Sequence, residues 1–211
     1  MIELLLVRHG NTFAPGDRIV WVGSGQDLPL VESGRAQARA FAETLEAADW
    51  RPTAALSGGL KRQAEHLQIA TAGVPAPNTH SALDEVDYGS WGGRTTEEIV
   101  AEHGDAAVRA WNEQSQWPLD AGWPETLPEV RGRVDRFAAE VASGAHGSRV
   151  LVCSSNGLLR WFLGLVPGAL EDAIEEGSFK VKTGHVGRMM WEESAGWRVA
   201  SWNQPPTAPL S

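Results

Sequence analysis

Three apolar runs along the chain predict strands that are buried on both faces. They lie at residues 2–7, 54–58 and 149–155. A strand in the middle of a parallel sheet is covered by helices on both sides, so its sequence is an apolar run rather than an alternation. Helical patterns follow the second and third runs, at residues 60–72 and 158–166. Strands that alternate with helices are typical of an α/β domain.

Two further segments have the spacing of amphipathic helices. Residues 32–50 end before Pro52, and their apolar face consists of Ala38, Phe41, Ala42 and Leu45. Residues 126–143 begin with Thr126 and Glu129, which are the residue types of a capping box at a helix N-terminus. Both segments are therefore predicted to be helices that cover the sheet.

The rest of the pattern predicts a closing hairpin and an insertion. Residues 179–202 alternate between apolar and polar positions and turn at residues 194–196. Residues 104–125 do not fit the alternation of strands and helices, so we expect a small lid-like insertion there, and a frayed tail at 203–211. Residues 1–211 are then one domain, a three-layer sandwich with a mostly parallel central sheet and helices on both faces.

Composition and charge narrow the classes of partner. The chain has 211 residues and a formal net charge of -9, which disfavours nucleic acid or an anionic membrane as a partner. Its only cysteine, Cys153, excludes an internal disulfide and fits a reducing compartment. Residues 2–7 are too short for a signal peptide, and no apolar stretch reaches the length of a membrane span. We expect a cytoplasmic protein. Because its net charge is negative, any site that binds an anion is expected to be a local group of arginines.

Polar residues that suit phosphate chemistry follow each of the three apolar runs. Ligands of open α/β sheets bind beyond the carboxyl ends of the strands. Arginines beside glycine-rich helix N-termini bind phosphate, and an imidazole at the centre of such a site is a candidate nucleophile toward phosphorus. The residues that follow the three runs are Arg8, His9, Gly10, Asn11 and Thr12; Ser57, Gly58, Gly59, Lys61 and Arg62; and Ser154, Ser155, Asn156 and Gly157.

Six segments, in this order along nearly the whole chain, resemble those of a known family. They are LLLVRHGNT at 4–12, QDLPLVESGRAQA at 26–38, LSGGLKRQAE at 56–65, LDEVDYGSWGG at 83–93, ETLPEVRGRV at 125–134 and VLVCSSNGLLR at 150–160. The first resembles the Arg-His-Gly signature of the histidine phosphatase superfamily, and the whole set is similar to its phosphoglycerate-mutase-like branch of small phosphatases and mutases.

The resemblance implies a role for each matching residue. His9 becomes the nucleophile that accepts the phosphoryl group, Arg8 and Arg62 the phosphate clamps, and Glu85 the acid that protonates the leaving oxygen. Asn11 and Thr12 are expected to bind phosphate or substrate beside them. Two arginines neutralise the phosphoryl oxygens without a metal, so no metal and no cofactor are expected. Each role has a plainer alternative, since Arg62 could be a solvated helix charge and Glu85 a surface residue.

The sequence departs from the family where Ser155 stands in place of a histidine. Ser155 can donate a hydrogen bond to a phosphoryl oxygen but brings no charge, and it could equally be only a helix cap. Loss of one preorganised donor lowers the rate by about 10²–10³, so the enzyme is expected to be slow unless another group compensates. The candidates are Asn156, which is also predicted to bind phosphate, and His185. A second departure is Pro15, where the family often has asparagine.

The function that follows is a metal-independent phosphomonoesterase that acts on a small phosphorylated metabolite through a phosphohistidine at His9. A phosphomutase of the same fold and a non-catalytic phosphate-binding member of the family are the alternatives. Outside the predicted site, several histidine and tryptophan residues have no assigned role. His66, His80, His103 and His146 are expected to be surface or structural residues, and the tryptophans at 111, 117 and 123 either pack the insertion or line a substrate entrance.

Overall fold

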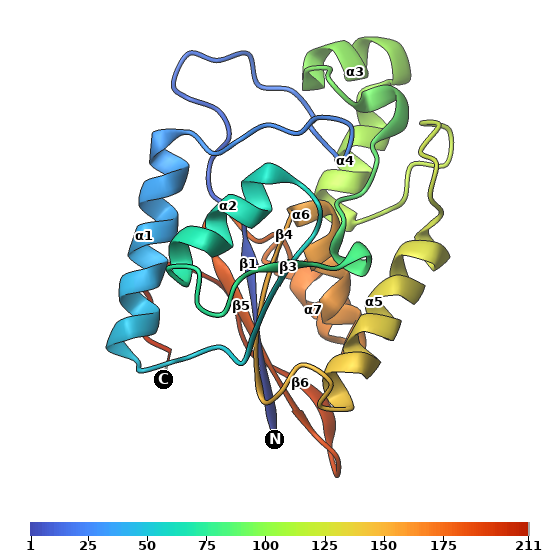
Figure 1. Ribbon diagram of the computed structural model, residues 1–211. Coiled ribbons are helices and arrows are strands. Elements are labelled where there is room, and N and C mark those ends of the chain that lie inside the picture. Colours follow the sequence, from blue (N-terminus) through green and yellow to red (C-terminus); the bar gives the residue numbers. More distant parts are fainter. Residues whose placement is uncertain (211) are drawn as a thin grey trace.

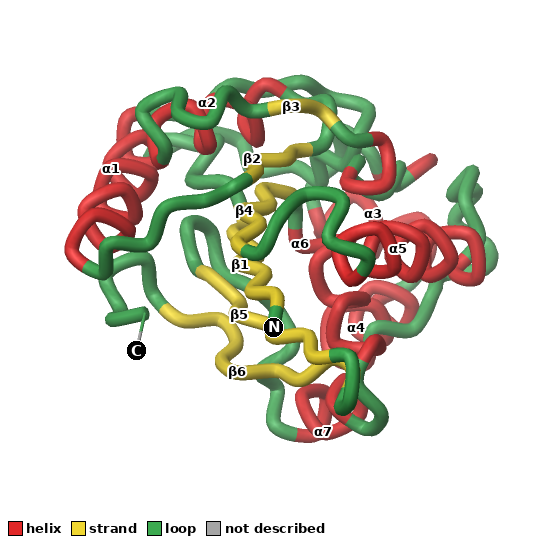
Figure 2. The backbone as a smooth tube through the Cα atoms, turned by 60° about the horizontal axis from the view of Figure 1, so that its bottom comes forward, coloured by secondary structure: helices red, strands yellow, loops and turns green. Residues whose placement is uncertain are grey.

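The computed structural model describes residues 1–210, which fold around one six-stranded mixed sheet (Figure 1). The strand order is β3-β2-β4-β1-β5-β6, and Figure 2 shows the strands in this sequence, with helices on both sides. The strands are β1 (Ile2–Arg8), β2 (Ala54–Ser57), β3 (Asn78–Thr79), β4 (Arg149–Ser154), β5 (Val186–Glu192) and β6 (Gly196–Gln204). The first four are parallel to one another, whereas β5 and β6 form the predicted antiparallel hairpin at one edge.

Successive side chains of the central strands enter two different apolar cores. In β1, Leu4 and Leu6 belong to the core on one face, and Leu5 and Val7 belong to the core on the other. Neighbouring β4 divides its residues in the same way. Because side chains point alternately to the two faces of a strand, a strand covered on both sides must be apolar throughout, as predicted. The three-layer arrangement is therefore confirmed.

The predicted helices form the two outer layers. Helices α1 (Glu32–Ala47) and α2 (Lys61–Ala70) cover one face, and α5 (Leu127–Ala142), α6 (Asn156–Leu159) and α7 (Ala169–Glu175) cover the other (Figures 1 and 2). The helix α5 begins where the sequence predicted, and both the backbone N–H and the hydroxyl of Thr126 donate to the Glu129 carboxylate. The segment predicted as one helix at 158–166 is instead the end of α6 followed by a 3₁₀ helix, Arg160–Leu165.

The predicted insertion at 104–125 contains a helix of its own. Helix α3 (Thr96–His103) and helix α4 (Asp105–Gln114) are separated by Gly104, which has a positive φ. Beyond α4, the chain returns through a loop whose Trp123 packs on Trp111 of the helix, with ring centroids 4.9 Å apart. We call these residues the tryptophan cluster: Trp91, Trp111, Trp117, Trp123 and Trp161. The three tryptophans of the insertion therefore pack it against the domain.

The expectation of a frayed tail is wrong for residues 203–210. Strand β6 extends to Gln204, the carbonyl of Pro206 accepts a hydrogen bond from the Thr44 hydroxyl, and Leu210 packs on the core under α1. Burial of Leu210 and pairing of the backbone hold this segment in place, although its composition is that of a loop. The last residue of the predicted tail, 211, lies outside the described residues. Across residues 1–210, we find no helix with the length and apolar character that a membrane crossing needs.

Candidate active site

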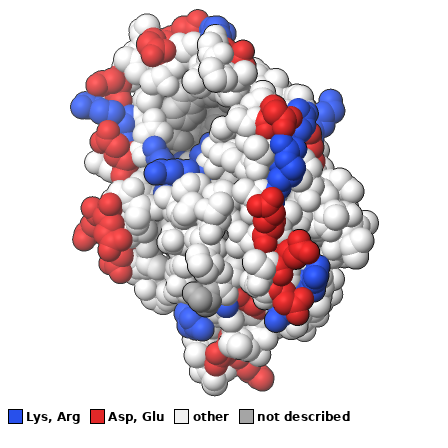
Figure 3. All heavy atoms as spheres, turned by 90° about the vertical axis from the view of Figure 1, so that its left-hand side faces the viewer, with Lys and Arg blue, Asp and Glu red and all other residues white. Residues whose placement is uncertain are grey.

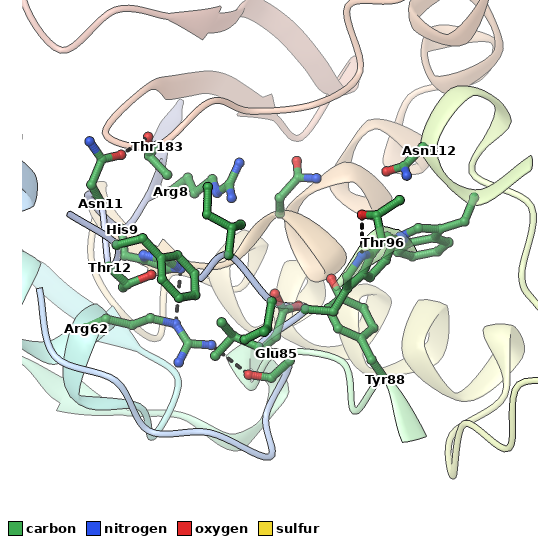
Figure 4. A pocket seen from close by; sticks show the side chains of 18 of the residues that line it. Arg8, His9, Asn11, Thr12, Arg62, Glu85, Tyr88, Thr96, Asn112 and Thr183 are labelled. Atoms are coloured by element: carbon green, nitrogen blue, oxygen red, sulfur yellow. Dashed lines mark hydrogen bonds between the residues drawn. The ribbon is translucent and has the colours of Figure 1, made fainter. Parts of the chain in front are cut away.

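A pocket of about 460 Å³ lies at the carboxyl ends of the parallel strands. Figure 4 shows Arg8, His9 and Arg62 on one side of it and Thr96 and Asn112 on the other, with Glu85 and Tyr88 between them. In the space-filling view of Figure 3, a hollow opens on one face of the molecule, with basic side chains at its lower edge. The sequence predicted that arginines gather in an anion site although the net charge of the chain is negative. Among residues 1–210, the pocket is lined by Arg8, Arg62 and Arg160 and by only one carboxylate, that of Glu85.

Strand register explains why distant segments meet here. Arg8, the last residue of β1, pairs with Ser154 of β4, and Ser57 of β2 pairs with Cys153. The chain continues from β1 into His9, whose backbone N–H donates to the carbonyl of Ser154. Because the three strands are parallel and neighbouring, the polar residues that follow them are delivered to one edge of the sheet.

His9 is held as a neutral imidazole with one nitrogen facing Arg62. Its Nδ1 is 2.8 Å from the carbonyl oxygen of Gly10, which places the proton on Nδ1 and leaves a lone pair on Nε2. Burial, together with the positive charges of Arg8 and Arg62, holds the pKa of His9 well below its ordinary value. The side chain is only 6% exposed. An unprotonated nitrogen in a fixed direction is what a nucleophilic histidine requires.

Arg62 connects this nitrogen to the loop that covers the site. Its Nε donates to His9 Nε2 over 3.1 Å, and its two terminal nitrogens donate to the carbonyls of Gln26 and Gly23. These three bonds leave two of the five guanidinium N–H groups for another acceptor. Arg62 is in the first turn of α2, where two glycines follow β2. Arg62 is buried, which fits the prediction that it is a site residue better than the alternative that it is a solvated charge on the helix.

Arg8 supplies the second guanidinium of the pocket. Its Nη1 donates to the carbonyl of Val181 over 2.9 Å, while its Nε is buried without a hydrogen-bond partner. Burial lowers the pKa of Arg8 from its ordinary value, and Glu85 partly offsets this effect. A buried cation with an unused donor is suited to bind an anion that enters the pocket.

Glu85 lies on the pocket wall against the first turn of α6. Its Oε1 accepts the backbone N–H of Val86, and the side chain is 6% exposed. A β-carbon on Gly157 would be 2.4 Å from this oxygen and 2.6 Å from the hydroxyl of Tyr88. Glycine is therefore required at position 157, because any side chain there would displace the carboxyl group.

The loop after β1 is held by contacts with α1 and the segment before β5. Asn11 accepts a hydrogen bond from the Thr183 hydroxyl through Oδ1, and its backbone N–H donates to Gln37. A β-carbon on Gly34 would be 2.2 Å from the carbonyl oxygen of Asn11, so the loop contacts the helix backbone directly. Asn11 and Thr12 both line the pocket, as does Thr183.

Ser155 and Asn156 are adjacent in sequence but have different surroundings. The Ser155 side chain is 1% exposed, its hydroxyl accepts a hydrogen bond from Gln63 Nε2, and it does not line the pocket. Asn156 does line the pocket. Its Oδ1 accepts the N–H of Val181, which leaves Nδ2 as a donor without a partner in residues 1–210. Of the two, the geometry favours Asn156 as the group that can reach a ligand.

His185 does not join this group of residues. Its Nδ1 is 2.9 Å from the carbonyl oxygen of Asn203, a residue of β6, and its side chain is not part of the pocket wall. The pocket thus collects Arg8, His9, Asn11, Thr12, Arg62, Glu85 and Asn156 of the residues that the sequence singled out, and leaves out Ser155 and His185.

Comparison with known proteins agrees with this arrangement. Residues 4–205 match the family described as the histidine phosphatase superfamily (branch 1). The chain belongs to this superfamily. The match runs from within β1, whose end carries Arg8 and His9, to the end of the hairpin that closes the sheet.

Relatives of the chain include mutases and phosphatases. A 2,3-bisphosphoglycerate-dependent phosphoglycerate mutase of Maricaulis maris is 33% identical over 56% of this chain, and the match spans about half of that protein, 49%. A second such mutase, from Gloeobacter violaceus, is 28% identical over 77% of this chain and 74% of that protein. These relatives and the family point to a phosphoryl-transfer enzyme.

Solved structures of histidine phosphatase relatives have the same fold. The alpha-ribazole phosphatase from Shigella flexneri superimposes with a TM-score of 0.78 over 100% of both chains, at 22% identity. A mycobacterial glucosyl-3-phosphoglycerate phosphatase superimposes with a TM-score of 0.75 over 97% of this chain and 99% of that one, at 26% identity.

Sequence reasoning did not place two further side chains, those of His66 and Arg160, at or beside the pocket. His66 is fully buried behind the nucleophile, where its Nδ1 accepts the N–H of Gly10, and burial lowers its pKa to about 4. It follows Arg62 by four residues on α2, a spacing that places both on one helix face and could have indicated it. Arg160 lies on the pocket wall over the ring of Trp111, 3.9 Å from its centroid, and no sequence pattern indicated this contact.

Proposed function

We propose that this protein is a metal-independent phosphomonoesterase that forms a phosphohistidine at His9. The observation that carries the proposal is the unprotonated Nε2 of His9, fixed by Gly10 and placed between the buried Arg62 and the half-buried Arg8. A neutral imidazole attacks phosphorus, whereas an imidazolium cannot, and the surrounding cations favour the neutral form while they attract the phosphate dianion.

The first step joins His9 to phosphorus. The Nε–H of Arg62 now faces the Nε2 lone pair, so we infer that this N–H turns to a phosphoryl oxygen when substrate enters. The N–P bond then forms while the bond from phosphorus to the ester oxygen breaks. Glu85, in its protonated form, transfers its proton to that oxygen, and an alcohol leaves.

The second step restores the enzyme. The Glu85 carboxylate accepts a proton from water, whose oxygen attacks phosphorus as the N–P bond breaks. Inorganic phosphate leaves, His9 is again neutral at Nε2, and Glu85 is again protonated. Arg8, Arg62 and the Nδ2 group of Asn156 bind the phosphoryl oxygens throughout, so the neutral amide of Asn156 takes the place of a cationic donor.

The rest of the pocket indicates a small phosphorylated metabolite as substrate. Apolar and aromatic side chains line the pocket together with the polar group at the strand ends: Phe13, Ile19, Val20, Trp21, Val22 and Trp111. Polar groups at the rim, such as Asn112 and Thr96, can bind hydroxyl groups of the alcohol portion.

The proposal is tested with an aryl phosphate, p-nitrophenyl phosphate. We expect phosphate release by the parent enzyme and a phosphorylated peptide containing His9, detected by mass spectrometry after rapid alkaline quenching. His9→Ala should lower the rate by more than about 10³-fold, since covalent catalysis is lost. His103→Ala, a matched change of a half-buried histidine at the end of α3 that does not line the pocket, should have no effect.

A parent rate equal to that of His9→Ala would overturn the proposal. Phosphate binding without turnover would then support a phosphate-binding protein. Transfer of the phosphoryl group to a second alcohol in preference to water would instead identify a mutase.

A further inference from the structure

A cluster of metal-binding side chains lies outside the candidate active site. His80 follows strand β3, Glu140 is near the end of α5, and His146 lies in the turn between α5 and β4. One ligand atom from each of the three lies within 4.8 Å of the other two. None of the three lines the active-site pocket, so the phosphoryl-transfer proposal does not use them.

The distances within the cluster resemble those of a zinc coordination sphere. Glu140 Oε2 is 3.0 Å from His80 Nε2 and 3.7 Å from His146 Nε2. Zinc binds imidazole nitrogen and carboxylate oxygen at about 2.0–2.2 Å in a tetrahedron, which separates neighbouring ligand atoms by about 3.3 Å. The two measured separations lie on either side of this value. Two imidazoles and one carboxylate are also a donor set that zinc uses, with water as the fourth ligand.

His146 is held with its ligand atom toward the cluster. Its Nε2 is buried and has no hydrogen-bond partner, which is rare for a buried polar atom. Gly144 and Gly147, both with a positive φ, flank His146 in this turn. The backbone carbonyl of His146 accepts a hydrogen bond from the hydroxyl of Thr53. The ring stacks on Phe137, with centroids 6.1 Å apart. The imidazole is therefore positioned before any ligand binds.

His80 needs a change of tautomer to bind a metal. Its Nδ1 accepts the N–H of Ala82 over 3.3 Å, so in the neutral ring Nε2 has the proton and donates to Glu140. A metal must displace that proton and break the long bond to Ala82. The need to displace a proton from His80 lowers the affinity for the metal, and the affinity decreases further as the pH falls. We therefore expect a site of moderate affinity rather than one on which folding depends.

We propose that His80, Glu140 and His146 form a binding site for a divalent transition metal such as zinc, with three protein ligands and water. The bound ion joins the segment after β3, the end of α5 and the turn before β4. His80 lies 60 residues before Glu140 in the sequence. The ion therefore stabilises the folded state, in which alone the three ligands are together.

The experiment uses tag-free full-length protein and measures two quantities. Co²⁺ binding is followed by the visible absorption of four-coordinate cobalt, and the midpoint of thermal unfolding is measured with and without Zn²⁺. We expect one Co²⁺ per chain. At a Zn²⁺ concentration a hundredfold above the dissociation constant, the folding equilibrium shifts about a hundredfold, or about 2.7 kcal/mol. This raises the midpoint by about 5–10 °C.

The variants His146→Ala, His80→Ala and Glu140→Gln should each weaken Co²⁺ binding more than about tenfold and remove the shift by Zn²⁺. The matched control is His103→Ala, because His103 also faces a glutamate, 3.6 Å from Glu102, but has no third ligand. Circular dichroism checks that each variant folds, and Glu140→Gln keeps the side-chain volume. Absence of saturable binding would overturn the proposal, as would binding that all three variants retain. Loss of phosphatase activity in His9→Ala leaves both readouts unchanged, so the two proposals are tested separately.

Discussion

Among the residues of the pocket, His9 and Glu85 are nearly closed to solvent but differ in how they are held. His9 has a hydrogen bond at each ring nitrogen, to Gly10 and Arg62, whereas one oxygen of Glu85 is bound only by the adjacent Val86 N–H. The proposed nucleophile, His9, is therefore fixed in direction, and the Glu85 carboxyl group keeps an oxygen that could reach a leaving group.

This difference predicts how Glu85→Gln affects different substrates. An alkoxide is a poor leaving group and needs a proton, whereas an activated phenolate leaves without one. We expect the variant to lose about 10²–10⁴-fold in kcat/KM on an alkyl phosphate but much less on p-nitrophenyl phosphate. Steady-state kinetics on both esters measures this, with phosphate affinity as the control for an intact site. Equal losses on the two esters would remove Glu85 from the acid role.

Gln63 determines what a histidine at position 155 can do. It is fully buried, and its Nε2 donates to the hydroxyl of Ser155, whose backbone leaves β4 beside His9. Ser155→His alone must overpack this space, so we expect it to lower the stability by about 1–3 kcal/mol and to give no gain in rate. Adding Gln63→Ala makes room for the ring next to His9. The double variant should regain stability and exceed the parent in rate by about tenfold or more, through a charged donor.

Both quantities are measured by thermal unfolding and by phosphate release. Gln63→Ala alone is the control, because it removes the hydrogen bond without adding an imidazole. If the double variant folds and is no faster than this control, a cation at this position does not assist the reaction.

At the scale of elements, the loop after β1 depends on its direct contact with α1. The β-carbons of alanines at positions 10 and 34 would lie 2.4 and 2.2 Å from backbone oxygens of the opposite segment. Gly34→Ala must therefore move the loop that carries His9, and we expect it to cost about 1–3 kcal/mol of stability and to reduce kcat. Urea unfolding and kinetics test this. Gly164→Ala, at a helical glycine with open space around it, should change neither. Unchanged kcat in Gly34→Ala would show that the loop tolerates displacement.

The sequence pattern predicted a helix or strand where the side chains of that segment form a clear apolar face. Helix α5 buries five apolar residues and was predicted together with its N-terminal residues. Helix α3 has a complete capping box, Thr95 with Glu98, but buries only Ile99, so no periodicity marked it. Strand β3 has two exposed polar residues and exists because it pairs with β2, a contact that its own sequence does not specify.

For the molecule as a whole, the layers follow from the apolar runs, because a strand that is apolar on both faces requires helices on both sides. Six of the seven pocket residues were predicted from strand ends and follow from the same topology, whereas Glu85 was predicted only from the family resemblance. The positions of Gln63, His66 and Arg160 depend on contacts between segments far apart in sequence. Thus Gln63 of α2 meets Ser155 of β4, and the packing of their side chains, rather than any motif, decides which residue reaches the pocket.

The tryptophan cluster gives the molecule a particular optical behaviour. Its rings lie 4.9–6.4 Å apart, a separation at which excitation passes readily between indoles, and Trp111 is both a member of the cluster and part of the pocket wall. The guanidinium of Arg160 lies 3.9 Å from the centroid of Trp111. Excitation absorbed at several of the rings can therefore reach Trp111, whose emission depends on its surroundings in the pocket wall. We therefore expect the intrinsic fluorescence of the protein to change when a ligand occupies the pocket, without any attached dye.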